Sequence, residues 1–194
     1  MEQSLRIVMV HSSHPGNIGA AARAMKNMCL SELFLVQPHD FPSAAASARA
    51  AGADDVLQSA KLASTLADAV AECRIVIGAS ARLRSVRWPQ LTPREAAVLA
   101  YTESRQAPVA FVFGRESSGL SNQELDLCTH LVHIPSNPAF SSLNVAMAVQ
   151  VISYELMLAD AATPSVAAVR TSPVGKKTAP VTSRSCFSTV TCGQ

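Results

Sequence analysis

Short apolar runs alternate along the chain with segments of helical period. Five runs rich in β-branched and aliphatic residues predict buried strands at 5–10, 33–36, 75–78, 108–113 and 131–134. Strands that are apolar on both faces, without polar alternation, are typical of a parallel sheet that is covered on both sides. The pattern therefore predicts an α/β fold with a mostly parallel sheet and helices on both of its faces.

Helices are predicted between these strands from apolar periodicity and from capping residues. Thr92 and Ser121 each precede a glutamate by three positions, which is the capping-box pattern of a helix start. The predicted helices begin near Asn17, Ser43, Leu62, Thr92, Ser121 and Ser141 or Ser142, and the last one runs to about residue 159.

Charge divides the 194 residues into two parts. Residues 1–160 hold twelve basic and fourteen acidic side chains, a net charge of −2, which excludes a uniformly basic nucleic-acid-binding domain. Residues 161–194 are rich in Ser, Thr and Pro and hold four basic side chains and no acidic one. We therefore predict one domain over 1–160 and a basic, disordered tail over 161–194.

The sequence indicates neither a membrane segment nor a metal site. No uncharged apolar run reaches the roughly 18 residues of a membrane helix, and the N-terminus lacks the pattern of a signal peptide. The five cysteines include no CxxC pair and the five histidines no HExxH pattern. We expect a cytoplasmic protein that holds no metal.

Three short patterns in the loops after predicted strands carry the candidate chemistry. They are N-I-G-A-A-A-R at 17–23, F-G-R-E-S-S-G-L at 113–120, and I-P at 134–135 with S-S-L-N-V-A at 141–146. The dinucleotide pattern GxGxxG and the serine-hydrolase pattern GxSxG are absent, and the glycines of the second pattern lack the lysine of a phosphate loop. Ligands bind at the carboxyl ends of parallel strands, so these loops are the expected site.

Together and in this order, the three patterns resemble the motifs of the SpoU branch of the SPOUT methyltransferases. The resemblance covers about residues 5–158 and is strongest to the tRNA-modifying enzymes of that branch. It implies a SPOUT-type fold with a trefoil knot, a homodimer, and S-adenosylmethionine (S-adenosyl-L-methionine) as the cofactor. The implied reaction is methyl transfer to a ribose 2′-hydroxyl of RNA, at the pyrimidine of position 32 of tRNA.

The resemblance also implies catalytic roles for five residues. Arg23 would act on the 2′-hydroxyl; because arginine stays protonated, its guanidinium would stabilise the forming alkoxide or bind a phosphate rather than serve as a base. Asn17 would orient Arg23 or the substrate, and Glu116 would hold a loop or pair with an arginine. Ser142 and Asn144 would contact the cofactor or the substrate.

The remaining site residues implied by the resemblance fall into two groups. The cofactor would be held by Ala79, Ser80, Ala81, Gly114, Ile134, Ser141, Ser142 and Leu143. The tRNA partner would be contacted by Arg82, Arg84, Arg87 and Arg115.

Each of these residues, taken singly, also has an ordinary structural explanation. Asn17 would be a helix cap, Gly19 a packing glycine, and Arg23 a solvated helix residue. Two other functions stay open: methylation of another tRNA or rRNA ribose, or a non-catalytic knotted RNA-binding module. The second follows from the tail, which stands where related enzymes carry a helical C-terminal extension.

Overall fold

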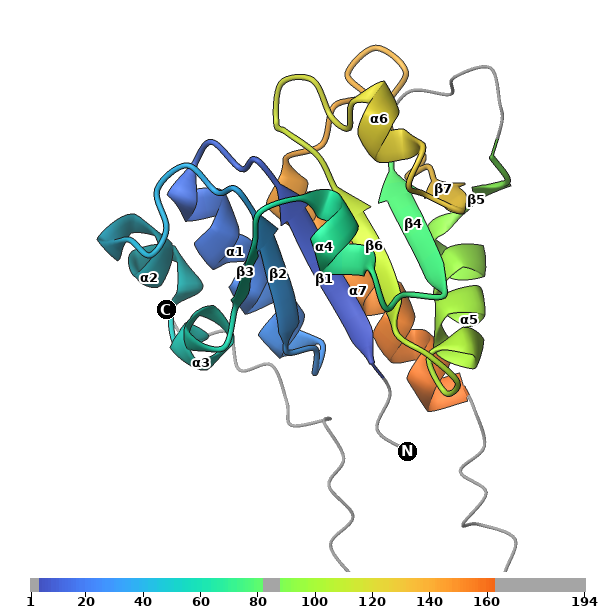
Figure 1. Ribbon diagram of the computed structural model, residues 1–194, viewed down its shortest axis with the longest axis horizontal. Helices are drawn as coiled ribbons and strands as arrows, with labels where there is room; N and C mark the ends of the chain where they lie inside the picture. The colour runs from blue at the N-terminus through green and yellow to red at the C-terminus, as the bar shows by residue number, and fades with distance from the viewer. Residues whose placement is uncertain (1–3, 82–87, 163–194) are drawn as a thin grey trace, which may run out of the picture. The chain divides into compact units, whose positions relative to one another are not determined.

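Seven parallel strands form the central sheet of the protein (Figure 1). The computed structural model describes residues 4–81 and 88–162. Across the sheet the strands run in the order β3, β2, β1, β6, β4, β7 and β5. Their bounds are Leu5–Val10 (β1), Glu32–Val36 (β2), Lys61–Ala63 (β3), Ile75–Ala79 (β4), Gln90–Leu91 (β5), Val109–Phe113 (β6) and His130–Val132 (β7). The predicted parallel α/β architecture is confirmed.

The two edge strands were not predicted from the sequence. β3 and β5 have only three and two residues, too few to show a pattern. The helix predicted from Leu62 was wrong at its start, because Leu62 lies in β3 and pairs with Leu35 of β2. The helix begins only after Thr65, whose side chain and that of Asp68 form a capping box.

Helices connect the strands of the sheet. Their bounds are Pro15–Asn27 (α1), Ala44–Ala50 (α2), Asp54–Gln58 (α3), Leu66–Val70 (α4), Pro93–Glu103 (α5), Asn122–Leu125 (α6) and Val145–Ala162 (α7). The capping boxes predicted at Thr92 and Ser121 are confirmed, and Ser43, predicted only as the start of a helix, is also an N-cap; each side chain accepts a backbone N–H three residues ahead.

Two further predicted helix starts were wrong, and both of these errors concern the motifs. α1 begins at Pro15 with His14 at the N-cap, so Asn17 lies inside the first turn and its amide is free for other contacts. α7 begins at Val145, later than the predicted Ser141 or Ser142. The residue that caps α7 is Asn144, whose Oδ1 accepts the N–H of Ala146 at 2.9 Å.

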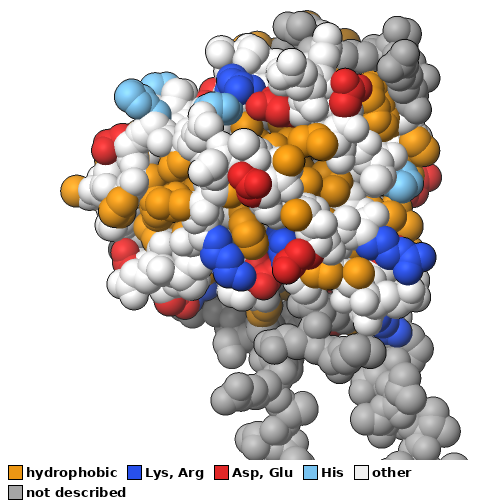
Figure 2. Space-filling model, viewed as in Figure 1, with side chains coloured by type: hydrophobic (Ala, Val, Ile, Leu, Met, Phe, Trp, Pro, Cys, Tyr) orange, Lys and Arg blue, Asp and Glu red, His pale blue; other side chains and the backbone are white. Residues whose placement is uncertain are grey.

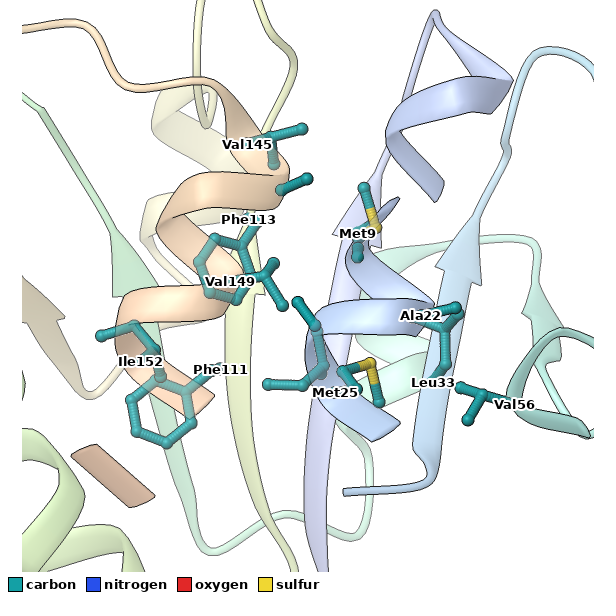
Figure 3. Close-up of a cluster of buried hydrophobic side chains, with 14 of the residues drawn as sticks. Met9, Ala22, Met25, Leu33, Val56, Phe111, Phe113, Val145, Val149 and Ile152 are labelled. Carbon is teal, nitrogen blue, oxygen red and sulfur yellow. The ribbon is translucent and has the colours of Figure 1, made fainter. Parts of the chain in front are cut away.

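The larger of two hydrophobic cores lies between the sheet and α1, α2, α3, α5 and α7. Figure 3 shows Met9 and Phe113 of the sheet packing against Met25 of α1 and against Val149 and Ile152 of α7. Within this core α1 and α2 approach so closely that a Cβ on Gly19 would lie 2.0 Å from the carbonyl oxygen of Ala46. The interpretation of Gly19 as a packing glycine is confirmed.

The smaller core covers the opposite face of the sheet. Because successive strand residues point to opposite faces, Val8 of β1 and Val112 of β6 belong to this side. They pack with Leu66 and Ala69 of α4 and with Leu125 of α6. Helices therefore lie on both faces, as predicted, with short helices on this one (Figure 1).

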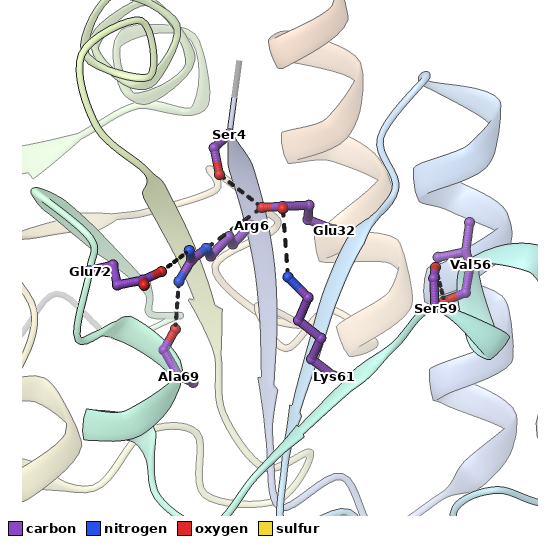
Figure 4. Close-up of polar contacts among 8 residues, drawn as sticks. All are labelled: Ser4, Arg6, Glu32, Val56, Ser59, Lys61, Ala69 and Glu72. Atoms are coloured by element: carbon purple, nitrogen blue, oxygen red, sulfur yellow. Dashed lines mark hydrogen bonds and ion pairs between the residues drawn. The ribbon is translucent and has the colours of Figure 1, made fainter. Parts of the chain in front are cut away.

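A charged cluster is built into this second face (Figure 4). Arg6 of β1 is 6% exposed and donates to Glu72 Oε2 at 2.6 Å and to the carbonyl of Ala69 at 3.3 Å. Its guanidinium also lies 3.6 Å from Glu32 and 4.9 Å from the centre of the Phe34 ring. Burial alone would lower the pKa of Arg6, but the bond with Glu72 and the nearby carboxylates outweigh it and raise that pKa. The charge is thus retained inside the fold.

α7 is long and apolar enough to cross a membrane by length and composition, and it is the one such helix in the described part of the chain. Its packing is that of a core helix, because Val149, Ile152 and Leu156 are almost fully buried against the sheet, α1 and α5. Its outer side leaves Met147 63% and Tyr154 46% exposed.

Candidate active site

The loops at the carboxyl ends of β4, β6 and β7 surround a cavity of about 390 Å³. A cavity of this size falls in the range of small-molecule sites. Figure 1 shows these loops, with the 135–144 segment, at one edge of the sheet. His133 tethers one wall, because its Nδ1 lies 3.2 Å from the carbonyl oxygen of Ser80, which can only accept a hydrogen bond.

The loop after β6 is folded back on itself by its two glycines. Arg115 and Gly119 exchange backbone hydrogen bonds of 3.2 and 2.9 Å, which close the loop. A Cβ on Gly114 would lie 2.2 Å from the carbonyl carbon of Gly119, and Gly119 itself has φ +70°. Both positions therefore need glycine, and the turn presents Glu116 to the neighbouring loops.

Glu116 accepts four hydrogen bonds from the segment that runs from the end of β1 through the first turn of α1. Oε1 accepts from the hydroxyl of Ser12 at 2.9 Å and from Asn17 Nδ2 at 3.0 Å. Oε2 accepts from the N–H of Ser13 at 3.2 Å and from its hydroxyl at 2.9 Å. The first two motifs are thereby bonded to each other.

These bonds determine the ionisation of Glu116. Burial alone would raise the pKa of this carboxyl group. Hydrogen bonds from Asn17, from backbone N–H groups and from the Ser13 hydroxyl outweigh that effect and lower the pKa to about 2. Glu116 is therefore an anion at any physiological pH.

Asn17 extends the network to the third motif. Asn144 Nδ2 donates to Asn17 Oδ1 at 3.0 Å, and Asn144 Oδ1 in turn caps α7. Glu116, Asn17 and Asn144, which the sequence places on three separate segments, thus form one continuous hydrogen-bonded chain. This is the arrangement by which the fold brings the three motifs together.

The predicted cofactor residues all lie in the lining of the cavity. That lining includes Ala79, Ser80, Ala81, Gly114, Ile134, Ser141, Ser142 and Leu143, together with Glu116 and Asn144. Ser141, Ser142, Leu143 and Asn144 are exposed, so they form the rim of the cavity rather than its floor. Their assignment to a cofactor stays a prediction.

Arg23 stands apart from this group. It is exposed on α1 and is not in the cavity lining. Arg23 lies six positions after Asn17, which corresponds to roughly 9 Å along the helix and about 120° around it. Within the described residues no hydrogen bond or ion pair joins Arg23 to another predicted catalytic residue. The structure therefore does not bring Arg23 to the cavity of its own chain.

Of the four arginines predicted to contact RNA, the structure describes Arg115. Arg82, Arg84 and Arg87 lie outside the described residues. Arg115 lines the cavity, and its guanidinium bonds to Glu124 Oε2 at 2.9 Å. The carboxylate of Glu124 therefore neutralises much of the positive charge that Arg115 could offer to an RNA phosphate.

The described part of the chain shows neither a continuous basic surface on the face in Figure 2 nor a group of side chains that could hold a metal ion. On the face shown in Figure 2, basic and acidic side chains are interspersed and form no continuous basic surface. In the described ranges 4–81 and 88–162, no group of three or more His, Cys, Asp or Glu side chains could hold a metal ion.

Sequence reasoning missed Ser12 and Ser13. The stretch from residue 11 to residue 16 was predicted to be a loop at the candidate site, but no role was assigned to its two successive hydroxyl groups, which lie two and three positions after the end of a buried strand. Their place at the ligand-binding edge of the sheet was the available signal. Nothing in the sequence indicated that they bond to Glu116, which lies 104 positions after Ser12.

Comparison with known proteins identifies the family. A profile of the SpoU rRNA Methylase family matches residues 4–154, well over half of the chain. The chain belongs to the SpoU methylase family. The resemblance inferred from the three motifs is thus confirmed.

Several relatives in this family are enzymes named TrmJ. The chain is 54% identical over 161 residues to tRNA (cytidine/uridine/adenosine-2′-O-)-methyltransferase TrmJ of Pseudomonas aeruginosa, which covers 82% of this chain and 62% of that protein. It is 51% identical over 170 residues to tRNA (cytidine/uridine-2′-O-)-methyltransferase TrmJ of Cronobacter sakazakii, covering 85% and 69%. The SpoU chain thus spans about two thirds of the length of these relatives.

Solved structures show the same SpoU fold. A probable methylase family protein from Haemophilus influenzae superposes with a TM-score of 0.81 at 42% identity, over 90% of this chain and 73% of that one. TrmJ from Z. mobilis superposes with a TM-score of 0.76 at 38% identity, over 82% and 71%.

Proposed function

We propose that this SpoU methylase transfers a methyl group from S-adenosylmethionine to a ribose 2′-hydroxyl of tRNA, at the pyrimidine of position 32. The observation that carries the proposal is the cavity whose lining combines the second and third motifs, with Asn17 of the first bonded to both. The relatives from Pseudomonas aeruginosa and Cronobacter sakazakii, named as tRNA 2′-O-methyltransferases, support it.

The charge of the cavity fits a cationic ligand. Glu116 lines it as a fixed anion, and no basic side chain forms an ion pair with Glu116 in the part of the chain that the structure describes. Val132, Ile134 and Leu143 add apolar surface suited to an adenine ring. S-adenosylmethionine, when bound, supplies an electrophilic methyl group on a positively charged sulfur. An anion beside the cavity favours binding of that charge.

The work left to the protein is to align the acceptor and to manage one proton. Ser142 and Asn144 lie at the rim of the cavity, where they would orient the ribose next to the methyl group. Arg23 would stabilise the oxygen as it loses its proton, or bind the adjacent phosphate, because a guanidinium remains charged throughout. Arg115 and the arginines near residue 84 would contact the RNA backbone.

A second copy of the chain would complete this site. Arg23 is exposed and does not line the cavity of its own chain, so a homodimer in which each chain offers Arg23 to its partner's cavity would unite the catalytic residues. Large apolar side chains suited to such an interface are exposed on either side of residues 141–146 of the third motif: Phe140 is 80% and Met147 63% exposed. The proposal includes a trefoil knot made by threading the C-terminal segment of the domain through a loop, a cytoplasmic location, and a domain over 1–160 followed by a basic tail over 161–194.

The direct test is methyl transfer from labelled S-adenosylmethionine to unmodified tRNA, followed by digestion to nucleosides. We expect the label in 2′-O-methylcytidine or 2′-O-methyluridine, and at least about a hundredfold less label with Arg23→Ala. Label in a base, or no label while S-adenosylmethionine still binds, would contradict the proposal. A parallel reaction with rRNA tests the alternative that the family description suggests.

A further inference from the structure

Ser12 and Ser13 follow β1 and belong to none of the three motifs. Ser12 is 3% exposed, and its buried hydroxyl donates to Glu116 Oε1 at 2.9 Å. Ser13 is exposed and donates twice to Glu116 Oε2, through its N–H at 3.2 Å and its hydroxyl at 2.9 Å. Three of the four hydrogen bonds that Glu116 accepts from this segment therefore come from these two serines.

This arrangement leaves Glu116 little capacity for a substrate. A carboxylate has about four lone-pair positions for hydrogen bonds, and Ser12, Ser13 and Asn17 supply four donors to them. A 2′-hydroxyl could reach Glu116 only by displacing one of these donors. Glu116 is consequently a fixed anion that orients its neighbours, and it is not the acceptor of the substrate proton.

The donors and acceptors of this hydrogen-bond network can be arranged in only one way. Because the ionised Glu116 cannot donate, the nitrogen of the Asn17 amide must face it, and the oxygen of that amide must face Asn144. The Asn144 amide must then present its nitrogen to Asn17, which leaves its oxygen for the N–H of Ala146. The orientation of an amide at the rim of the cavity is thus set by the charge of Glu116.

We propose that Ser12 and Ser13 are positioning residues for the methyl-transfer reaction. Through Glu116 and Asn17 they hold the Asn144 amide in a single orientation at the rim of the cavity. This inference rests on the proposed function, since it assigns the two serines to the same site. It adds a part of the chain that the three motifs do not include.

The test compares the double variant Ser12→Ala/Ser13→Ala with two controls. Ser104→Ala removes an equally buried hydroxyl, 4% exposed, which donates to the carbonyl of Tyr101 at 3.0 Å, outside the network. Ser13→Thr keeps the hydroxyl at an exposed position. For each protein we would measure kcat, the KM for S-adenosylmethionine and the melting temperature, and record the side-chain amide signals of Asn144 by NMR.

We expect the double variant to lose at least about tenfold in kcat, because hydrogen bonds to a charged group are lost. Its KM for S-adenosylmethionine should change less than kcat, and the Asn144 amide signals should shift or broaden. Ser104→Ala should lower the melting temperature without these changes, and Ser13→Thr should behave as the unchanged protein.

Two results would overturn the inference. One is wild-type kcat in the double variant; the other is a kcat loss in Ser104→Ala of the same size, which would indicate a general effect of stability. If the unchanged protein transfers no methyl group, the proposed function fails instead. The Asn144 amide signals then decide the inference alone, and unaltered signals in the double variant would refute it.

Discussion

The side chain of Asn144 makes two contacts that substitution can separate. Its Oδ1 caps α7 by accepting the N–H of Ala146 at 2.9 Å, and its Nδ2 donates to Asn17 Oδ1 at 3.0 Å. Asn144→Ala removes both contacts. Asn144→Asp has the same shape and keeps the cap, but it replaces the donor with a second acceptor. Asn17 cannot turn its amide to compensate, because its nitrogen is held by Glu116.

The expected magnitudes differ between the two variants. Loss of an asparagine N-cap costs about 1 kcal/mol, and loss of an exposed side-chain hydrogen bond costs about 0.5–1 kcal/mol. In a domain of this size each kcal/mol lowers Tm by about 2–4 °C, so Asn144→Ala should melt roughly 3–8 °C lower. In Asn144→Asp the retained cap and the favourable charge at the helix N-terminus should hold Tm within about 3 °C.

Turnover should not follow this order of stability. We expect kcat for methyl transfer to fall by at least about tenfold in both variants, because both lose the oriented amide at the rim of the cavity. The assay is thermal unfolding together with steady-state methylation of tRNA. Full turnover in Asn144→Asp would refute the reasoning that the direction of this hydrogen bond matters, and an unchanged Tm in Asn144→Ala would refute the assignment of the cap.

Three further predictions concern the α1–α2 packing, the loss of stability in acid and the RNA contact. Gly19→Ala should lower the free energy of unfolding in urea by at least about 2 kcal/mol, because its Cβ would lie 2.0 Å from a backbone oxygen. Gly16→Ala should not, because its Cβ would meet only one side chain, at 3.4 Å, and equal stability of the two variants would contradict the α1–α2 packing. The pKa of Glu116 is lowered to about 2, so its contribution to stability is present above pH 4.5 and is lost as the pH falls toward 2. Between pH 7 and pH 2 the unchanged protein should lose about 1–2 kcal/mol more free energy of unfolding than Glu116→Gln, a difference already reduced for the partial solvent exposure of Glu116. If the free energy of unfolding falls in parallel for both proteins, the carboxylate is not stabilised by its hydrogen-bond donors. Glu124→Gln removes the charge that pairs with Arg115, so tRNA should bind more tightly and with a steeper salt dependence in a filter-binding titration; weaker binding would indicate that Arg115 does not face the RNA.

The sequence predicted the sheet better than its edges. The long strands β1 and β6 are buried on both faces and leave an unmistakable apolar run, whereas β3 and β5 are held mainly by pairing with a neighbour. Hydrogen bonds to an adjacent strand depend on tertiary structure and leave no periodic signal. This is why Leu62 was assigned to a helix although it lies in β3.

The motif residues of the site were predicted, but their connections were not. Asn17 looked like a helix cap because its residue type and position before an apolar periodic segment fit that role. The structure gives the cap position to His14 and turns the Asn17 amide to Glu116 and Asn144. Contacts across about a hundred positions of sequence follow from how the loops meet at the sheet edge, which local patterns do not encode.

The most direct test of the central claim uses two tRNA transcripts that differ by one oxygen atom. One has an ordinary pyrimidine ribose at position 32, and the other has a 2′-deoxyribose there. With labelled S-adenosylmethionine, we expect methylation of the first transcript and background label in the second. Equal labelling of both would place the methyl group elsewhere, and no labelling of either would contradict the assignment of this protein as a tRNA ribose methyltransferase.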